Sequence, residues 1–217
     1  MNLYIYDHCP FCTRARMIFG LKKIEYTEVV LNNDDEVTPI DMIGKKSLPI
    51  LEVEKDHYLG ESLDIVDLID KRFGQPNLVI APNKDIEDWI NQSTSLIYEL
   101  AIPRWAFSNF KEFTTLSSKI YFINKKQSLL GDFTILLKQS KEKISKINDQ
   151  LKILNSLINI ENQTVLSGGW SYTHIKLFPL LRSLSIVKDI QWPNQVSLWM
   201  NEVSKQCGIT LHNDIAI

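Results

Sequence analysis

The stretch YIYDHCPFCTRARMIFG (residues 4–20) decides the first half of the fold and holds two of the chain's three cysteines. Its first residues are rich in β-formers, and the polar pair Asp7-His8 ends that run. From Pro10 onward the apolar residues follow a helical stripe, and proline suits a first helical turn because its missing N–H is no loss there. The stretch therefore predicts a strand, a tight turn and a helix.

The next segments continue the pattern of a small mixed sheet. EYTEVVL (25–31) alternates like a second strand, and residues 32–44 contain a short helix. Residues 49–59 hold two strand-like runs around a charged turn, followed by a helix with a regular apolar stripe. A βαβ unit makes its strands parallel, and a hairpin adds an antiparallel pair. This order predicts an α/β domain of the thioredoxin type over residues 1–73.

Beyond residue 73 the sequence pattern changes from alternating strands and helices to a linker followed by helices. Residues 74–84, GQPNLVIAPNK, combine glycine and proline without a period and predict a linker. Beyond it, apolar stripes indicate about five or six helices and no convincing pair of strands. Pro103 is expected to kink or end the first of these helices, and Pro193 to lie early in the last. Residues 85–217 are therefore predicted to form an all-helical domain.

The composition is that of a globular protein with balanced charge. The chain has 217 residues, with 24 basic and 26 acidic side chains and a formal net charge of −2. Nucleic acid and anionic membrane surfaces favour a large basic excess, so we expect neither as a partner. Sparse cysteines, a start unlike a signal peptide and the lack of a long apolar run favour a reducing cytoplasm.

The C-x-x-C pair of Cys9 and Cys12 has three candidate uses. A zinc site normally needs four ligands, and the remaining candidates, Cys207 and the four histidines, show no paired spacing. Two buried structural cysteines are the plain alternative. The third use, a redox pair, has the strongest physical argument.

That argument begins with the position of Cys9, which lies in the N-cap region if Pro10 opens the helix. Free backbone N–H groups and the helix dipole stabilise a thiolate there, and such thiols have pKa values of about 3.5–7.5, against about 8.5 for free cysteine. Cys12, three residues on, lies on the same helical face. Arg14 and Arg16 are either a further source of positive potential or solvated surface groups. We expect Cys9 to attack disulfides and Cys12 to resolve the intermediate.

Pro49 follows Leu48 at the start of the third predicted strand. A proline cannot donate to a central ladder, which suggests an edge or a bend. Propensity favours a trans bond, since cis makes up only about 5–6% of X–Pro bonds. A cis bond would instead turn the backbone N–H and C=O of Leu48 towards Cys9, where they would pair with a peptide-like substrate.

Glu61-Ser62 begins a helix directly after a strand. The hydroxyl and N–H of Ser62 suit a carboxylate bound at the positive end of the helix, and Glu61 suits an ammonium group. A ligand with adjacent α-amino and α-carboxylate groups needs this combination. The alternative is an ordinary N-terminal cap.

With C-P-F-C, S-L-P and G-E-S in this order before a helical second half, the chain resembles the bacterial glutaredoxin 2 family, the glutathione-transferase-shaped glutaredoxins. The matching segments are LYIYDHCPFCTRARMIFGLK (3–22), LNNDDE (31–36), SLPIL (47–51), ESLDIVDLIDK (61–71) and FPLLRSL (178–184). The resemblance implies a thioredoxin-like domain, a helical domain and glutathione-dependent reduction of protein disulfides and glutathione mixed disulfides. It also implies a cytoplasmic monomer with glutathione as co-substrate and no metal or bound cofactor.

Motif position then assigns roles. Cys9 would be the nucleophile and Cys12 its partner. The residues implied in glutathione binding are Pro10 and Phe11 of the C-P-F-C motif, Leu48 and a cis-Pro49 for the cysteinyl part, and Glu61 and Ser62 for the γ-glutamyl part.

Two departures from the family pattern concern the glutathione site. Small glutaredoxins carry a lysine where Tyr6 stands, so the glycyl carboxylate of glutathione needs another cation, with Lys22, Lys45 and Lys46 as candidates. Phe11 replaces the usual tyrosine and keeps an aromatic wall without the hydroxyl.

A third departure concerns a helix cap. Transferase-like helical domains carry a Ser/Thr-x-x-Asp capping box, whereas SYTH (171–174) has His174 in place of the acid. We therefore expect Ser171 to cap the helix without its reciprocal acceptor, at a cost of about 0.5–2 kcal/mol in stability.

Two other functions stay open at this point. A cysteine-type glutathione transferase or dehydroascorbate reductase has the same fold, but usually needs one cysteine, so Cys12 argues against it. A non-catalytic, transferase-shaped interaction protein can lose the redox cysteines, whereas this chain retains both, although an intact site does not exclude a binding partner. We expect Cys207 to be a bystander, since this lone thiol in a helix tail has no charged or paired neighbour in the sequence.

Overall fold

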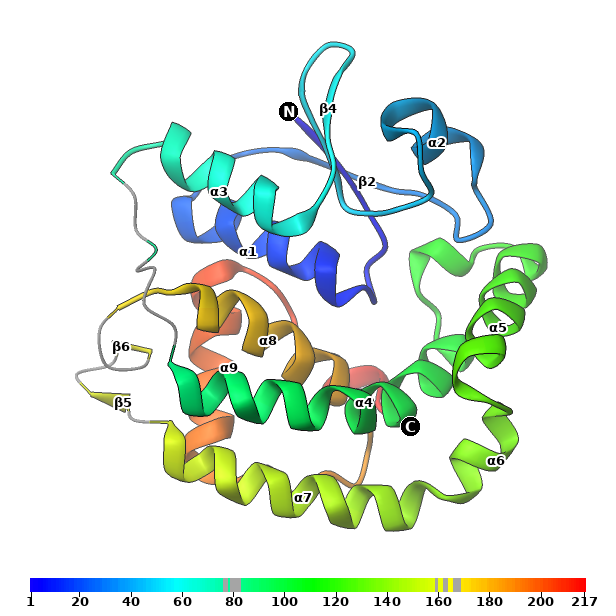
Figure 1. The fold of residues 1–217 in the computed structure, drawn as a ribbon, viewed down its shortest axis with the longest axis vertical. Coiled ribbons are helices and arrows are strands. Elements are labelled where there is room, and N and C mark those ends of the chain that lie inside the picture. Colours follow the sequence, from blue (N-terminus) through cyan, green and yellow to red (C-terminus); the bar gives the residue numbers. More distant parts are fainter. Residues whose placement is uncertain (76–77, 79–82, 159, 162–163, 166–168) are drawn as a thin grey trace. The chain divides into compact units, whose positions relative to one another are not determined.

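The computed structural model describes residues 1–75, 78, 83–158, 160–161, 164–165 and 169–217 (Figure 1). By packing, the chain divides into two compact units, the first made of residues 1–76 and 105–129 and the second of residues 77–104 and 130–217. Residues 76–77 and 79–82, most of the predicted linker, lie outside the described residues.

A four-stranded sheet in the order β2-β1-β3-β4 forms the base of the first unit. Its strands are β1 (Asn2–Ile5), β2 (Thr27–Val30), β3 (Ile50–Glu54) and β4 (His57–Leu59). β1 pairs in parallel with β2 and antiparallel with β3, and β4 pairs antiparallel with β3. The predicted βαβ unit followed by a hairpin is thus confirmed, and it places the end of β1 in the centre of the sheet.

Helices α1 (Pro10–Lys22) and α3 (Ser62–Arg72) lie side by side (Figure 1). A buried ion pair between Lys22 Nζ and Asp70 Oδ1, at 2.9 Å, joins the two helices, and Lys22 also donates to the carbonyl of Phe73. The short helix α2 (Val37–Ile43) packs against β4 and ends at Gly44, whose φ of 73° favours glycine. The Lys22 contacts hold the C-terminal end of α1 against α3, and the two cysteines lie at the other end of α1.

Residues 105–129 pack with the first unit although they follow it in the chain. They contain the end of α4 (Lys84–Phe107), the 3₁₀ helix η1 (Lys111–Phe113) and nearly all of α5 (Leu116–Leu130). The N–H of Asn33 donates to the carbonyl of Glu112 at 2.9 Å, and the Thr114 hydroxyl donates to Asn32 Oδ1 at 2.7 Å. The predicted domain boundaries at residues 73 and 85 cut the chain into consecutive segments and stay a prediction. Packing instead groups residues 105–129 with the sheet.

The second unit is helical. It contains most of α4, together with α6 (Phe133–Lys138), α7 (Ser140–Leu157), α8 (Tyr172–Leu184), α9 (Asn194–Cys207) and the 3₁₀ helix η2 (Asn213–Ile215). α9 packs against α7 and α8, and the rings of Trp199 and Phe178 are fully buried there. Within the described residues, six α-helices follow residue 83, in agreement with the number predicted.

Two local expectations for this half are tested. Of the two effects expected of Pro103, an end of the helix is wrong, because α4 continues to Phe107, and a kink stays a prediction. A pair of strands is present where none was expected, since β5 (Ile160–Glu161) and β6 (Thr164–Val165) pair antiparallel. Each strand has two residues, which is too short for an alternating pattern to be recognised.

The expected loss at the cap of α8 was wrong. His174 Nδ1 accepts a hydrogen bond from the N–H of Ser171 at 3.2 Å and lies 3.0 Å from the Ser171 hydroxyl. An imidazole nitrogen therefore takes the place of the carboxylate oxygen and completes a reciprocal capping box. The ring is almost fully buried and packs against Trp170 and Trp199, which holds Nδ1 in position.

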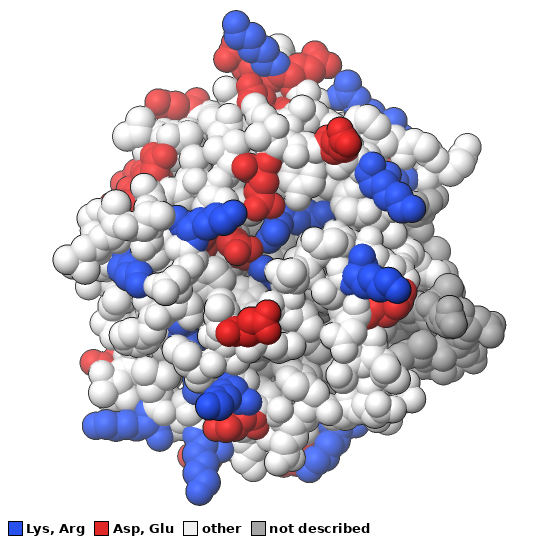
Figure 2. Space-filling model, turned by 180° about the vertical axis from the view of Figure 1, so that it is seen from behind, with Lys and Arg blue, Asp and Glu red and all other residues white. Residues whose placement is uncertain are grey.

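Charge is dispersed over the surface. On the face shown in Figure 2, basic and acidic side chains are interspersed among neutral ones. Among the described residues, no helix combines the length and apolar character needed to cross a membrane.

The capping role of His174 predicts a selective loss of stability. We expect His174→Ala to lower the free energy of unfolding by about 2 kcal/mol or more, because it removes both the acceptor and a buried ring. His57→Ala, a matched change at an exposed histidine, should change it by less than about 0.5 kcal/mol. Urea unfolding of both variants measures the difference, and equal losses would contradict the capping role.

Candidate active site

Cys9 lies at the turn between β1 and α1. Its backbone angles, φ −70° and ψ 123°, are those of an N-cap residue, and Pro10 is the first residue of the helix. Its N–H donates to the Tyr6 carbonyl at 3.3 Å, and its carbonyl accepts from the N–H of Thr13 at 3.0 Å. The predicted N-cap position is confirmed, so the Cys9 sulfur lies near the free N–H groups of the first turn.

Cys12 is fully buried, whereas Cys9 is partly exposed, and both thiols are free. The Tyr6 N–H donates to the Cys12 sulfur at 3.4 Å. The thiol of Cys12 also hydrogen-bonds to Cys9. Cys9 is therefore the sulfur that a substrate can reach, and Cys12 stays within reach of it.

The two thiols differ in acidity. The hydrogen bond from Cys12 is the largest cause that lowers the pKa of Cys9 to about 6; burial opposes it, while His8 and the N–H groups of Cys12 and Phe11 assist. Burial, followed by the hydrogen bond and charge of Cys9, raises the pKa of Cys12. At neutral pH Cys9 is a thiolate while Cys12 keeps its proton, which is the division of roles that disulfide exchange requires.

Neither arginine of α1 is among the leading causes of the lowered pKa of Cys9. Arg16 is held by two carboxylates, Asp7 at 2.8 Å and Glu28 at 2.9 Å. The Arg14 guanidinium lies 4.7 Å from the centre of the Phe11 ring. After the hydrogen bond from Cys12, the electrostatic contribution of His8 is the next cause that lowers the pKa of Cys9.

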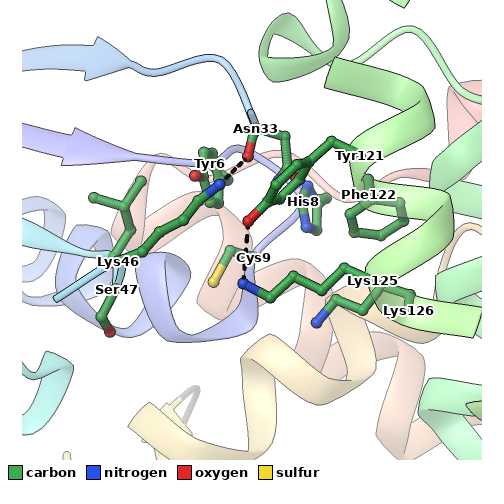
Figure 3. Close-up of a pocket in the computed structure, with 11 residues that line it drawn as sticks. Tyr6, His8, Cys9, Asn33, Lys46, Ser47, Tyr121, Phe122, Lys125 and Lys126 are labelled. Carbon is green, nitrogen blue, oxygen red and sulfur yellow. Dashed lines mark hydrogen bonds between the residues drawn. The ribbon is translucent and has the colours of Figure 1, made fainter. Parts of the chain in front are cut away.

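A pocket of about 230 Å³ opens beside Cys9 (Figure 3). Its walls come from the end of β1, the loops before α2 and β3, and α5. The lining residues are Tyr6, His8, Cys9, Asn33, Lys46, Ser47, Leu48, Tyr121, Phe122, Lys125 and Lys126. All of them belong to the first packing unit.

Three lysines give this pocket a positive character. Lys46 donates to the Asn33 carbonyl at 2.6 Å and lies 3.7 Å from the centre of the Tyr121 ring. Lys125 donates to the Tyr121 hydroxyl at 3.3 Å, and Figure 3 shows it extending from α5 together with Lys126. Burial, followed by the charge of Lys125, lowers the pKa of Lys46 to about 8. Three ammonium groups around one pocket favour an anionic ligand.

Of the three lysines suggested by the sequence, only Lys46 lines the pocket. Lys22 is buried in its ion pair with Asp70 and acts as a link between helices. Lys45 pairs with Glu61 at 2.5 Å.

The residues predicted to bind glutathione are only partly brought together. Leu48 lines the pocket with Cys9, and the Leu48-Pro49 bond is cis. Pro10 and Pro49 are buried, and Phe11, two residues after Cys9, is 45% exposed. Ser62 is buried in the first turn of α3, and Glu61 is its N-cap residue with a φ of 63°. Pro10, Phe11, Pro49, Glu61 and Ser62 are not among the residues that line the pocket, and their roles stay predictions.

Comparison with known proteins decides the family. Residues 85–216 match the model of the glutaredoxin 2 C-terminal domain, and residues 3–77 match that of the glutathione S-transferase N-terminal domain. Glutaredoxin 2 of Escherichia coli K12 is 43% identical over 217 residues, which is 100% of both chains. The chain belongs to the glutaredoxin 2 family. As a member of the glutaredoxin 2 family, it is a glutathione-dependent thiol-disulfide oxidoreductase.

Solved structures agree with membership of the glutaredoxin 2 family. Glutaredoxin 2 from Salmonella typhimurium, determined in complex with glutathione, is 44% identical and has a TM-score of 0.95 over 100% of this chain and 98% of that one. A glutathione S-transferase from Rhodospirillum rubrum has a TM-score of 0.61 at 15% identity, covering 94% of this chain and 87% of that one. The second likeness shows the fold alone, and confirms a thioredoxin-like domain followed by a helical domain.

Several pocket residues of this glutaredoxin 2 family member escaped the sequence analysis. Tyr121, Lys125 and Lys126 lie on α5, about 110 residues from the cysteines, and only a contiguous basic pair marked that helix. The sequence marks His8 only as a turn residue and as one of four histidines that lack the paired spacing of a zinc site. Glu112, its buried partner, gave no signal, because a charged residue between aromatic ones is normally solvated.

Cys207, the third thiol of this glutaredoxin 2 family member, belongs to the second packing unit. Cys207 is buried in the last turn of α9, and burial raises its pKa to about 12. Within the described residues, no group of three or more histidine, cysteine, aspartate or glutamate side chains is arranged to hold a metal ion.

The lowered pKa of Cys9 predicts its reactivity as a function of pH. The rate of alkylation by iodoacetamide should rise through a midpoint near pH 6, because the thiolate forms as the pH rises through the pKa of Cys9. Cys207 should not react at neutral pH, and Cys207→Ser should leave the profile and the turnover unchanged. Mass spectrometry of the labelled peptides measures this, and a midpoint near the free-cysteine value of about 8.5 would contradict the prediction.

Proposed function

We propose that Cys9 is the nucleophile of this oxidoreductase, that Cys12 is the resolving thiol and that the pocket beside Cys9 binds part of glutathione. The observation that carries the proposal is the partly exposed Cys9 sulfur at a helix N-terminus, with a lowered pKa, facing a pocket with three lysines. The substrates we propose are glutathionylated proteins and protein disulfides, with the chain acting as a monomer in a reducing cytoplasm and using no metal or bound cofactor.

The reaction with a glutathionylated protein takes two exchanges. The Cys9 thiolate attacks the glutathione sulfur of the mixed disulfide; the protein leaves as a thiolate, and a Cys9–glutathione disulfide forms. A second glutathione thiolate then attacks the glutathione sulfur of this intermediate, which releases oxidised glutathione and restores the Cys9 thiolate.

A protein disulfide uses Cys12 as well. Cys9 attacks one sulfur and forms a mixed disulfide with the substrate, and the other substrate sulfur leaves as a thiolate. Cys12 loses its proton and attacks the Cys9 sulfur, which releases the reduced substrate and forms the Cys9–Cys12 disulfide. Two glutathione molecules reduce that disulfide and become oxidised glutathione. The raised pKa of Cys12 suits this order, because it keeps Cys12 protonated until Cys9 has reacted.

The size of the pocket suggests how glutathione is divided among the residues. Its volume of about 230 Å³ is below the roughly 300–1,000 Å³ of typical ligand pockets. It therefore suits the cysteinyl and glycyl parts, with Leu48 on the former and both Lys46 and Lys125 on the glycyl carboxylate. Ser62 and Glu61 at the start of α3 remain the proposed contacts of the γ-glutamyl part, with Phe11 and the two prolines as apolar walls.

Two cysteine variants test the catalytic roles. In steady-state reduction of a glutathione mixed disulfide, coupled to glutathione reductase, Cys9→Ser should be inactive while Cys12→Ser keeps a substantial fraction of the wild-type rate. Cys12→Ser should lose most of its activity on a protein disulfide. Full activity of Cys9→Ser would sink the proposal, and conjugation of an electrophile without disulfide reduction would favour a transferase instead.

The lysine proposal has its own test. Lys46→Met and Lys125→Met should each raise KM for glutathione about tenfold with little change in kcat, because each removes a charge-assisted contact worth about 1.4 kcal/mol. Lys119→Met, on α5 but outside the pocket lining, is the matched control and should leave KM unchanged. Unchanged KM in both pocket variants would remove Lys46 and Lys125 from the glutathione site.

A further inference from the structure

His8 and Glu112 form a buried pair directly beside the nucleophile. His8 Nδ1 lies 2.5 Å from Glu112 Oε1, and the same oxygen accepts the backbone N–H of His8 at 3.0 Å. The Glu112 side chain has no exposed surface, and His8 is only 5% exposed. Glu112 Oε2 makes no hydrogen bond with the described residues. The two hydrogen bonds described for this carboxylate are both made by Oε1 with His8.

Aromatic rings enclose the imidazole of His8. The ring centres within 6 Å of it belong to Trp105 at 4.8 Å, Phe122 at 5.2 Å, Phe113 at 5.4 Å, Phe110 at 5.8 Å and Tyr6 at 5.9 Å. The faces of aromatic rings attract cations and leave no room for bulk water. This enclosure favours a charged imidazole over a neutral one once a counter-charge is present.

Glu112 provides that counter-charge. An ionised carboxylate without solvent is strongly unfavourable unless a positive group is bound to it, and a neutral imidazole would leave a net negative charge in the interior. The bonds to His8 outweigh burial and lower the pKa of Glu112, so the carboxylate is ionised. An imidazolium makes the pair neutral overall and satisfies both groups.

We propose that Glu112 holds His8 as an imidazolium beside Cys9, and that this buried pair makes the two active-site thiols unequal. His8 lines the pocket together with Cys9, and Glu112 lies on η1 with no exposed surface. His8 and Glu112 are positioning residues, since they act on the nucleophile through charge.

The effects of the pair on the pKa values of the two thiols support this assignment. His8 is among the groups that lower the pKa of Cys9, whereas Glu112 is among those that raise the pKa of Cys12. The pair thus acts on the two cysteines in opposite directions. Tyr6 on the β1 side and Lys126 on α5 also lie near the cysteines; burial lowers the pKa of Lys126, and the charge of Cys9 opposes that shift. The other ionisable groups in the pocket lining beside Cys9 are Lys46, Tyr121 and Lys125.

The first test is the isosteric change Glu112→Gln, which keeps the hydrogen bond to the His8 N–H but removes the charge. We expect the midpoint of Cys9 alkylation to rise by about one pH unit, so that the rate at pH 6 falls about fivefold. His8→Phe with Glu112→Gln should give the same shift as Glu112→Gln alone, because both lose the same imidazolium. An unchanged or lower midpoint in folded Glu112→Gln would overturn the proposal.

A measurement on the unaltered protein guards against a variant that fails to fold. Nitrogen-15 chemical shifts of the His8 ring at pH 7 should show both nitrogens protonated in the reduced protein. One unprotonated ring nitrogen there would overturn the proposal. Asp41→Asn, which removes an exposed carboxylate from the same packing unit, is the charge control and should leave the Cys9 midpoint in place.

The inference rests on Cys9 as the proposed nucleophile, but the two fail separately. Alkylation and ring protonation are measured without turnover, whereas the role of Cys9 is tested by the activity of Cys9→Ser. A shifted midpoint together with an active Cys9→Ser would leave the charge pair standing and remove the proposed mechanism.

Discussion

The carboxylate of Glu112 binds the turn that carries the active-site cysteines to a helical segment about 100 residues further along the chain. Its Oε1 accepts the N–H of His8 and contacts the imidazole, while its backbone carbonyl accepts the N–H of Asn33. One buried residue thus fixes both the strand-to-helix turn and the loop after β2. The pocket wall contributed by α5 depends on this attachment, because η1 directly precedes that helix.

The same arrangement separates the structural and chemical parts of the site. The backbone around Cys9 is determined locally by β1, the turn and the proline that opens α1, as in any helix N-terminus. Side chains from more distant segments then set the electrostatics: Glu112 through His8, and three lysines around the pocket mouth. The Cys9 thiolate is therefore stabilised by its own helix, while the ligand environment is supplied mainly by packing.

The differences between expectation and structure have physical causes. His174 stands where a carboxylate was expected at the α8 cap. Its Nδ1 accepts the hydrogen bond from the Ser171 N–H that a carboxylate oxygen would accept, so the capping box is kept. Pro103 lies within α4, and the helix continues past it. α4 is buried along much of its length, so tertiary packing outweighs the unfavourable free energy of a proline inside a helix. Arg14 and Arg16 were placed near the thiol by sequence distance, but the side chain of Arg16 turns to Asp7 and Glu28.

The sequence by itself determined the order of elements in the first unit, the N-cap position of Cys9, the reach of Cys12 and the family. These features depend on period, turn residues and short-range spacing, all of which are local. Only the tertiary structure decided that residues 105–129 pack with the sheet, that Lys46, Lys125 and Lys126 surround one pocket, and that Glu112 partners His8. A charged residue in a sequence carries no sign of its burial or of its partner, because both arise when distant segments are brought together.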